Sequence, residues 1–268
     1  MTTRNIPIVL VSDFGHTDPF AGIVKGVILN ICPNAQLVDL THGIRPQDIF
    51  QGAFVLYRSF GFFPKGSIFC AVVDPGVGSQ RAPIAIKTRN YYFVGPDNGL
   101  LWPAASADTI ETCVCLDRPE FCLEQISTTF HGRDIFAPIA AWIRMGTPLH
   151  LLGRTMACPN EFKFPVPKLE SQGMILTVLG RDRFGNLTLN LKSQEFESGF
   201  SALFSLEFKG VKITRVFETY EQAPKDIFFV LAGSAGFMEV ALKNSSAARM
   251  LKADVLDRFL LKSRREPE

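Results

Sequence analysis

Short apolar runs alternate with segments of helical spacing through the first half of the chain. The runs at 8–11, 36–40 and 68–73 are short and mostly apolar, as in strands buried on both faces of a parallel sheet. Between them, the segments that follow Pro19 and Asp48 place apolar residues at every third or fourth position. This alternation predicts a Rossmann-like, doubly wound, mostly parallel sheet.

The rest of the first half continues the pattern. Residues 83–87 and 91–94 predict two more strands, and residues 135–145 predict a helix. Asp18 and Pro19 fit the N-cap and first position of the first helix, because aspartate accepts from free backbone N–H groups and proline needs no partner there. Capping is therefore the alternative to any ligand-binding role for Asp18.

The second half of the chain has a different pattern. Periodicity is lost between residues 156 and 173, where three prolines occur, at 159, 165 and 167. Beyond this stretch, short alternating segments predict a smaller β-barrel-like domain, with strands at 174–179, 187–191, 211–216, 227–231 and 237–242 and a short helix at 247–251. The predicted organisation is an α/β domain over residues 1–157, a linker over 158–172 and a β-rich domain over 173–268.

Composition and charge narrow the class of protein. The 268 residues are 47% hydrophobic and 20% charged, with a net charge of +2, which is typical of a globular protein. Basic residues cluster only in the tail, at Lys262, Arg264 and Arg265, which argues against a nucleic-acid-binding surface. No signal peptide or membrane span is expected, and the six cysteines lack CxxC spacing, as in a reduced cytoplasmic protein.

The apolar run at 68–73 ends abruptly in polar residues. Asp74 follows it, a turn containing Gly76 and Gly78 comes next, and Arg81 stands seven residues after the acid. Ligands of open α/β sheets bind beyond the carboxyl ends of the strands, so this turn is a candidate site edge. Its alternative role is structural, with aspartate capping its own turn and arginine as ion-pair partner.

Right-handed crossovers would bring several strand ends to one rim of the sheet. The polar residues predicted to meet there are Asp13, His42, Asp74 and Asn98. Carboxylates suit the two hydroxyls of a ribose, asparagine matches an adenine edge, and the 24 phenylalanines offer surface for stacking a base. These features predict a nucleoside-sized ligand. The GxGxxG, P-loop and GxSxG motifs do not occur.

Motifs distributed along nearly the whole chain resemble the S-adenosyl-L-methionine (SAM) hydroxide adenosyltransferases, a family related to the fluorinases and chlorinases. The resemblance rests on the order and spacing of these motifs, which are Ser12–Gly15 with Asp18–Phe20, Lys25–Ile28, Val72–Gly78, Gly95–Leu100, Phe130–Asp134, Asp182–Asn186, and Gly233–Ser234 leading to Met238–Ala241.

The resemblance implies hydrolysis of SAM to adenosine and L-methionine, with SAM as substrate and no cofactor or metal. It also implies a homotrimer in which each site lies between the N-terminal domain of one subunit and the C-terminal domain of the next. The implied catalytic residues are Asp74, Arg81 and His131. The implied substrate contacts are Asp13 with the ribose, Asp182 and Ser234 with the methionine end, and Asn186 and Phe184 with adenine.

The chain departs from the halogenating relatives at two places. Those enzymes carry tyrosine where this chain has Asp74 and lack the Arg81 and His131 partners, which favours hydroxide over halide here. Ala235 follows Ser234 where the fluorinase has an arginine, so that contact is absent or supplied elsewhere. The resemblance also implies adenine contacts near Ala247 that the sequence does not define.

In the implied reaction, Arg81 holds the developing hydroxide, Asp74 orients the group, and His131, with a reference pKa near ~6.5, accepts the proton. Two alternatives stay open. One is a metal-dependent nucleotide phosphohydrolase with Asp13, Asp18, Asp74 and His131 as ligands. The other is a protein that binds adenosine or SAM without turnover.

Overall fold

The computed structural model describes residues 6–157, 159–200 and 204–263. The chain divides into two compact units, Met1–Lys163 and Phe164–Glu268, which are described separately. Strand β8 (Lys168–Glu170) lies within the segment predicted from the sequence to be a linker.

Within the described part of the first unit, seven strands form one mixed sheet in the order β2-β1-β3-β5-β4-β6-β7. The strands β2, β1, β3 and β5 run parallel to their neighbours, and β4, β6 and β7 continue the sheet in antiparallel pairing. The bounds are β1 Pro7–Ser12, β2 Gln36–Thr41, β3 Ile68–Val72, β4 Pro83–Thr88, β5 Tyr92–Pro96, β6 Ile110–Cys115 and β7 Arg154–Thr155.

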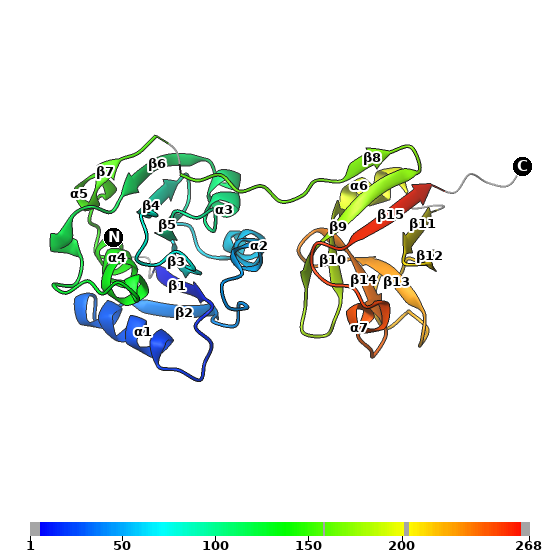
Figure 1. Cartoon of the computed structure of the whole chain (residues 1–268), viewed down its shortest axis with the longest axis horizontal. Coiled ribbons are helices and arrows are strands. Elements are labelled where there is room, and N and C mark those ends of the chain that lie inside the picture. The colour runs from blue at the N-terminus through cyan, green and yellow to red at the C-terminus, as the bar shows by residue number, and fades with distance from the viewer. Residues whose placement is uncertain (1–5, 158, 201–203, 264–268) are drawn as a thin grey trace, which may run out of the picture. The chain divides into compact units, whose positions relative to one another are not determined.

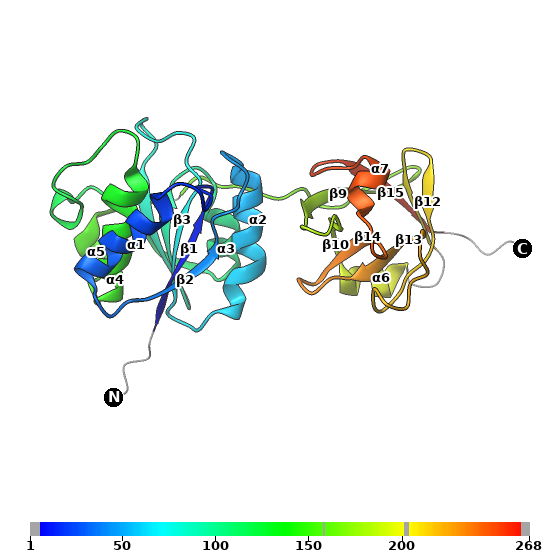
Figure 2. The same ribbon diagram turned by 90° about the horizontal axis from the view of Figure 1, so that it is seen from below.

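Helices cover both faces of this sheet (Figures 1 and 2). On one face lie α1 (Phe20–Ile31), α4 (Ala137–Arg144) and α5 (Leu149–Leu152), and on the other lie α2 (Ile49–Ser59) and α3 (Trp102–Ala107). A π-helical turn, η3 (Gly132–Phe136), precedes α4, and short 3₁₀ turns form η1 (Phe60–Phe62) and η2 (Pro119–Phe121). The layers confirm the predicted doubly wound α/β class.

The first helix starts differently from the prediction. Its N-cap is Pro19, without a side-chain cap, and the Pro19 carbonyl accepts the first helical bond from the Ile23 N–H at 2.9 Å. The expected capping role of Asp18 is therefore wrong. By contrast, Asp48 caps α2 by accepting from the Gln51 N–H at 2.8 Å.

In the described part of the second unit, eight strands form a nearly closed, barrel-like sheet, which confirms the predicted class (Figure 1). Their order is β12-β11-β15-β9-β10-β14-β13, with β8 beside β9, and Val216 bridges to Val230 near the open edge. Besides β8, the elements are β9 Gly173–Arg181, β10 Leu187–Lys192, α6 Ser193–Gly199, β11 Phe204–Phe208, β12 Val211–Ile213, β13 Phe228–Ala232, β14 Phe237–Leu242, α7 Ala247–Leu251 and β15 Arg258–Ser263.

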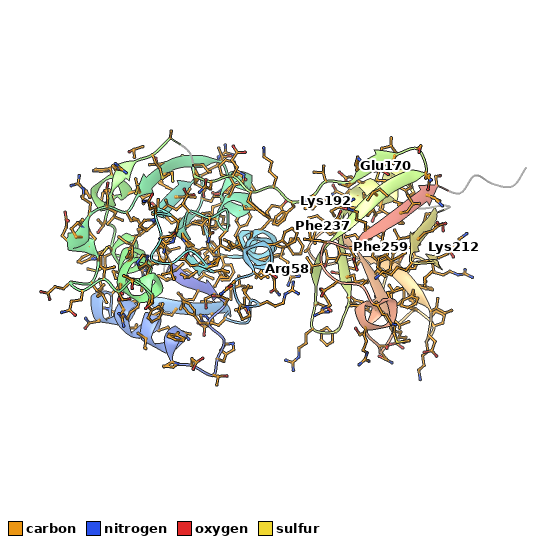
Figure 3. All side chains as sticks on the ribbon, viewed as in Figure 1. Arg58, Glu170, Lys192, Lys212, Phe237 and Phe259 are labelled. Carbon is orange, nitrogen blue, oxygen red and sulfur yellow. The ribbon has the colours of Figure 1, made fainter. Side chains whose placement is uncertain are left out.

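Aromatic side chains pack among the aliphatic residues that form most of the core of the second unit. Phe259, labelled in Figure 3, is fully buried. It stacks on Phe208 with the ring centres 4.4 Å apart. The Nζ atom of Lys192 lies 3.6 Å from the centre of the Phe237 ring (Figure 3). Among the residues that the structure describes, none of the helices is both long and apolar enough to span a membrane.

Candidate active site

A hollow of about 240 Å³ opens at the carboxyl ends of the parallel strands in the first unit. Asp13 follows β1 and Asp74 lies just beyond β3, while His131 precedes the π-helical turn η3. The structure thus brings three of the predicted residues to one cavity. Its lining is Asp13, Phe14, Gln47, Val72, Asp74, Pro75, Val77, Thr129, Phe130, His131 and Gly132.

Asp74 and Arg81 form a nearly buried ion pair beside this hollow. Their side chains are only 6% and 9% exposed. The Nε atom of Arg81 donates to Asp74 Oδ1 at 2.9 Å and to Oδ2 at 3.0 Å, and Nη2 also donates to Oδ2. Such multiple contacts between guanidinium and carboxylate fix the guanidinium plane.

His131 completes this network as a hydrogen-bond acceptor. Arg81 Nη2 lies 2.7 Å from His131 Nδ1. Because arginine only donates, Nδ1 must be unprotonated and Nε2 carries the ring proton of the neutral form. Burial, and then the charge of Arg81, lower the pKa of His131 below its usual value, so the neutral form is favoured.

The third guanidinium nitrogen has no partner in the described part of the chain. Arg81 Nη1 is buried and makes no hydrogen bond with any described residue. Nε and Nη2 are already held by Asp74 and His131. A buried donor without a partner is costly, so Nη1 is suited to receive an oxygen atom of a ligand or water.

Close backbone contact brings the Asp74–Arg81 loop to the segment that carries His131. Gly78 has a φ of +78°, and a Cβ atom built there would lie 2.4 Å from the Thr128 carbonyl oxygen. Only glycine allows this conformation and this approach without a clash.

The His131 segment is itself held by Asp134, which is fully buried. Its Oδ2 accepts from the Ser127 N–H at 2.8 Å and from Ser127 Oγ at 2.7 Å. Burial alone would raise the pKa of Asp134, but the hydrogen bonds from Arg133 and Ser127 outweigh it and lower the pKa. Asp134 therefore orders the loop as an ionised carboxylate.

Asp13 is oriented by an unusual backbone conformation. Its Oδ2 accepts from the Gln47 N–H at 2.8 Å, and Gln47 has a φ of +66°. This region is uncommon for a residue other than glycine, so the surrounding structure holds the Gln47 backbone there at a cost in free energy. None of the described residues donates a hydrogen bond to Oδ1, so this oxygen is open to a ribose hydroxyl.

A second hollow, of about 910 Å³, lies in the second unit. Asp182, Phe184 and Asn186 line it, and Phe184 is 77% exposed at the tip of the β9–β10 hairpin. Asn186 donates to Asp182 twice, from N–H to Oδ1 and from Nδ2 to Oδ2, each at 2.8 Å. The hairpin therefore contains an Asx-type turn, and the same turn places both residues on the hollow.

Tyr220 and Glu239, at or near this hollow, were not predicted as site residues from the sequence. Tyr220 lines the hollow and its hydroxyl donates to Glu239 Oε2 at 2.9 Å, while Asn186 Nδ2 lies 3.5 Å from the same hydroxyl. Burial, and then the bond to Glu239, raise the pKa of Tyr220. Ser234 does not line the hollow, but its neighbour Gly233 adjoins the Glu239 carboxylate.

The start of α7 lies against the same hairpin turn. The Ala248 N–H donates to the Gly185 carbonyl at 2.9 Å. The region near Ala247, whose place the sequence left undefined, is thereby brought beside Asn186.

The metal-dependent alternative fits this geometry poorly. Both oxygens of Asp74 are already bound by Arg81. Asp18 is exposed on the turn before α1 and does not line the hollow that Asp13 and His131 line. A cation at Asp74 would therefore face an arginine at hydrogen-bonding distance.

Comparisons with known proteins agree with the resemblance seen in the sequence. Family models described as SAM hydroxide adenosyltransferase N-terminal domain and C-terminal domain match residues 8–153 and 176–259. The (R)-S-adenosyl-L-methionine hydrolase of Salinispora arenicola is 36% identical over 243 residues, which cover 90% of this chain and 91% of the relative. A fluorinase from Nocardia brasiliensis is 27% identical over 244 residues, covering 79% and 81% of the two chains.

A solved structure extends the similarity to three dimensions. The crystal structure of an uncharacterized conserved protein from Thermotoga maritima has a TM-score of 0.89 and 32% sequence identity. The match covers 95% of this chain and all of that one.

Proposed function

This chain belongs to the SAM hydroxide adenosyltransferase family, and on that premise we propose that it hydrolyses S-adenosyl-L-methionine to adenosine and L-methionine. The observation that carries the mechanism is the network of Asp74, Arg81 and His131. Asp74 and His131 line the hollow of the first unit, and the arginine that joins them keeps a buried Nη1 without a hydrogen-bond partner among the described residues.

In the proposed reaction a water oxygen bound by Arg81 Nη1 attacks C5′ of SAM. The O–C5′ bond forms as the C5′–S bond breaks, and the sulfur leaves as the neutral thioether of methionine. The leaving group needs no general acid and no cofactor, because the sulfonium is already positively charged. The protein contributes an in-line position for the water and electrostatic stabilisation of the developing hydroxide.

The attacking water must lose one proton. His131 is poorly placed to accept it, because Nδ1 already accepts from Arg81 and a hydrogen bond with the Ser127 backbone also holds the ring. Asp74 lines the hollow, and its Oδ1 accepts only one of the Arg81 bonds. We assign to Asp74 the role of accepting the proton, which then passes to solvent. We assign to His131 the role of holding the guanidinium of Arg81 in place.

The roles of the substrate-binding residues are also proposals. Asp13 would accept hydrogen bonds from the ribose hydroxyls through Oδ1, since Oδ2 already accepts from the Gln47 N–H. On the second unit, Asp182 and Ser234 would meet the amino-acid end of SAM, and Asn186 and Phe184 the adenine. Of these four residues, Asp182, Phe184 and Asn186 line the hollow. The paired contacts among Asp182, Asn186 and Tyr220 support a prearranged polar wall there.

We further propose the homotrimer implied by the resemblance, in which the N-terminal domain of one subunit and the C-terminal domain of the next hold one substrate. The proposal is supported by the distribution of the proposed site residues over the two units. Those for the ribose and the attacking water lie on the first unit, and those for adenine and the methionine end lie on the second. A cytoplasmic location remains a prediction from the cysteine pattern.

Coexpression of Arg81→Ala and Asp182→Ala chains tests this arrangement. On random mixing, about a quarter of the shared sites would combine an intact Arg81 with an intact Asp182 from neighbouring copies, so activity should return in the mixture. Each variant alone should be nearly inactive. A site formed within one chain would recover nothing on mixing.

The proposed function is tested by incubating the purified protein with SAM in ¹⁸O-labelled water, with and without chelator. Mass spectrometry should find labelled oxygen on the 5′ position of adenosine, together with free methionine, and chelator should leave the rate unchanged. Ligand recovered intact on the protein would instead indicate a binding protein. A rate abolished by chelator and restored by a divalent cation would favour metal-dependent chemistry.

A further inference from the structure

The Asp97–Asn98 corner, which follows β5, touches both ends of the Asp74–Arg81 loop. The Nδ2 atom of Asn98 donates to the carbonyl of Val73, the residue before Asp74, at 2.8 Å. The Asp97 N–H donates to the carbonyl of Ala82, the residue after Arg81, at 2.9 Å. One corner therefore fixes the distance between the two ends of the loop.

The orientation of the Asn98 amide follows from its second contact. Its Oδ1 accepts from the Leu100 N–H at 3.2 Å, so Nδ2 must face the Val73 carbonyl. Val73 is fully buried, and a Cβ atom built on Gly52 would lie 3.1 Å from its Cγ2. The backbone before Asp74 is thus confined by a polar contact and by packing.

The geometry points to Asn98 as a positioning residue for the reaction, an inference that rests on the proposed function. Asn98 touches neither Arg81 nor the water position. It acts through the Val73 carbonyl, whose place sets where the Asp74 carboxylate begins. A misplacement of about 1 Å can lower the rate by about a hundredfold. Loss of this hydrogen bond should therefore shift Asp74 and, through the ion pair, the guanidinium of Arg81.

Asn98→Asp is the sharpest variant, because it keeps the shape and the acceptor for Leu100 while removing the donor to Val73 at neutral pH. We expect kcat to fall by about ten- to a hundredfold with KM within about threefold of the wild type. Asn98→Ala should behave alike. Steady-state measurements of kcat scatter by about twofold. A folded Asn98→Asp protein whose kcat lies within that range of the wild type would overturn the inference.

Asn90→Ala is the matched control. Asn90 precedes β5 as Asn98 follows it, and its Nδ2 donates to Asp108 Oδ1 at 2.6 Å, at the other end of the strand. If lost stability alone explained the effect, Asn90→Ala would lower kcat as much as Asn98→Asp. We expect its kcat to be unchanged.

A readout independent of turnover separates this inference from the proposed function. The Arg81 Nε–H, held by both oxygens of Asp74, should give a protected signal in ¹H–¹⁵N spectra of the wild type, assigned by its loss in Arg81→Lys. The signal should broaden or exchange faster in Asn98→Asp and stay unchanged in Asn90→Ala. An unaltered signal in Asn98→Asp contradicts the positioning role, whereas a wild type without turnover contradicts the proposed function.

Discussion

Replacement of Arg81 by lysine is expected to lower kcat by about a hundredfold or more, although the positive charge is kept. The guanidinium uses Nε and Nη2 to hold Asp74 and His131 and leaves Nη1 for the attacking oxygen. A lysine ammonium cannot occupy all three positions, so the water loses its fixed donor. Steady-state kinetics should show a KM close to that of the wild type, because ribose, adenine and methionine contacts are untouched.

Arg154→Lys provides the comparison for this variant. Arg154 also pairs with an aspartate, Asp117, at 3.3 Å, but its side chain is 76% exposed. Exposed pairs contribute about 0–1 kcal/mol to stability, so neither kcat nor the melting temperature should change appreciably. Comparable turnover in Arg81→Lys and the wild type would remove Arg81 from the chemistry.

The second large effect concerns the two ways of replacing His131. His131→Ala should lower kcat by about a hundredfold, because Arg81 Nη2 loses one of its two acceptors and keeps only Asp74 Oδ2, so the guanidinium is held from one side alone. His131→Asn should keep kcat within about tenfold of the wild type, because the asparagine Oδ1 can accept near the place of Nδ1. If His131 were the proton acceptor, asparagine would be as inactive as alanine, since an amide does not titrate.

The dependence of kcat on pH also tests whether His131 holds Arg81 in place, and the direction of the expected change is defined. Burial and Arg81 lower the pKa of His131, so the unfolded chain binds this proton more readily than the folded one. The stabilisation associated with neutral His131 is therefore present above about pH 6.5 and is lost as the pH falls below it. Protonated Nδ1 cannot accept from Arg81, so kcat should fall over the same acidic range. In His131→Asn this acidic fall should disappear, and its persistence would assign the titration to another group.

The rim of polar residues was predictable because parallel strands place their carboxyl ends together. The sequence therefore predicted that Asp13, His42, Asp74 and Asn98 meet. Asn98 contacts the residue before Asp74, and His42 Nδ1 lies 2.7 Å from the hydroxyl of Ser12, the residue before Asp13, so both contacts agree with this. The prediction that Asp18 caps the first helix was wrong. An aspartate directly before a proline matches the sequence signature of an N-cap, but in the structure the N-cap is Pro19 and the helix begins at Phe20.

Contacts made through tertiary structure could not be found from patterns. Tyr220 stands in a polar stretch without periodicity, and its partner Glu239 interrupts an apolar strand, so neither suggests the other. Strands β11 and β15 were missed. They pair with each other across more than fifty residues of chain, and β11 also forms a hairpin with β12. The strand predicted over 211–216 was too long, since β12 ends at Ile213 and only Val216 makes an isolated bridge.

The corner that supports the Asp74–Arg81 loop also sets where the first unit can be cut. Asp97 Oδ1 accepts from the Asn160 N–H at 2.7 Å, Asn160 Nδ2 donates to the Asp97 carbonyl at 2.7 Å, and Phe162 covers Gly99. Burial raises the pKa of Asp97, so this carboxyl depends on its partner. A fragment ended at residue 157 would strip that partner from the back of the loop. For domain expression, the stop codon therefore belongs after Lys163.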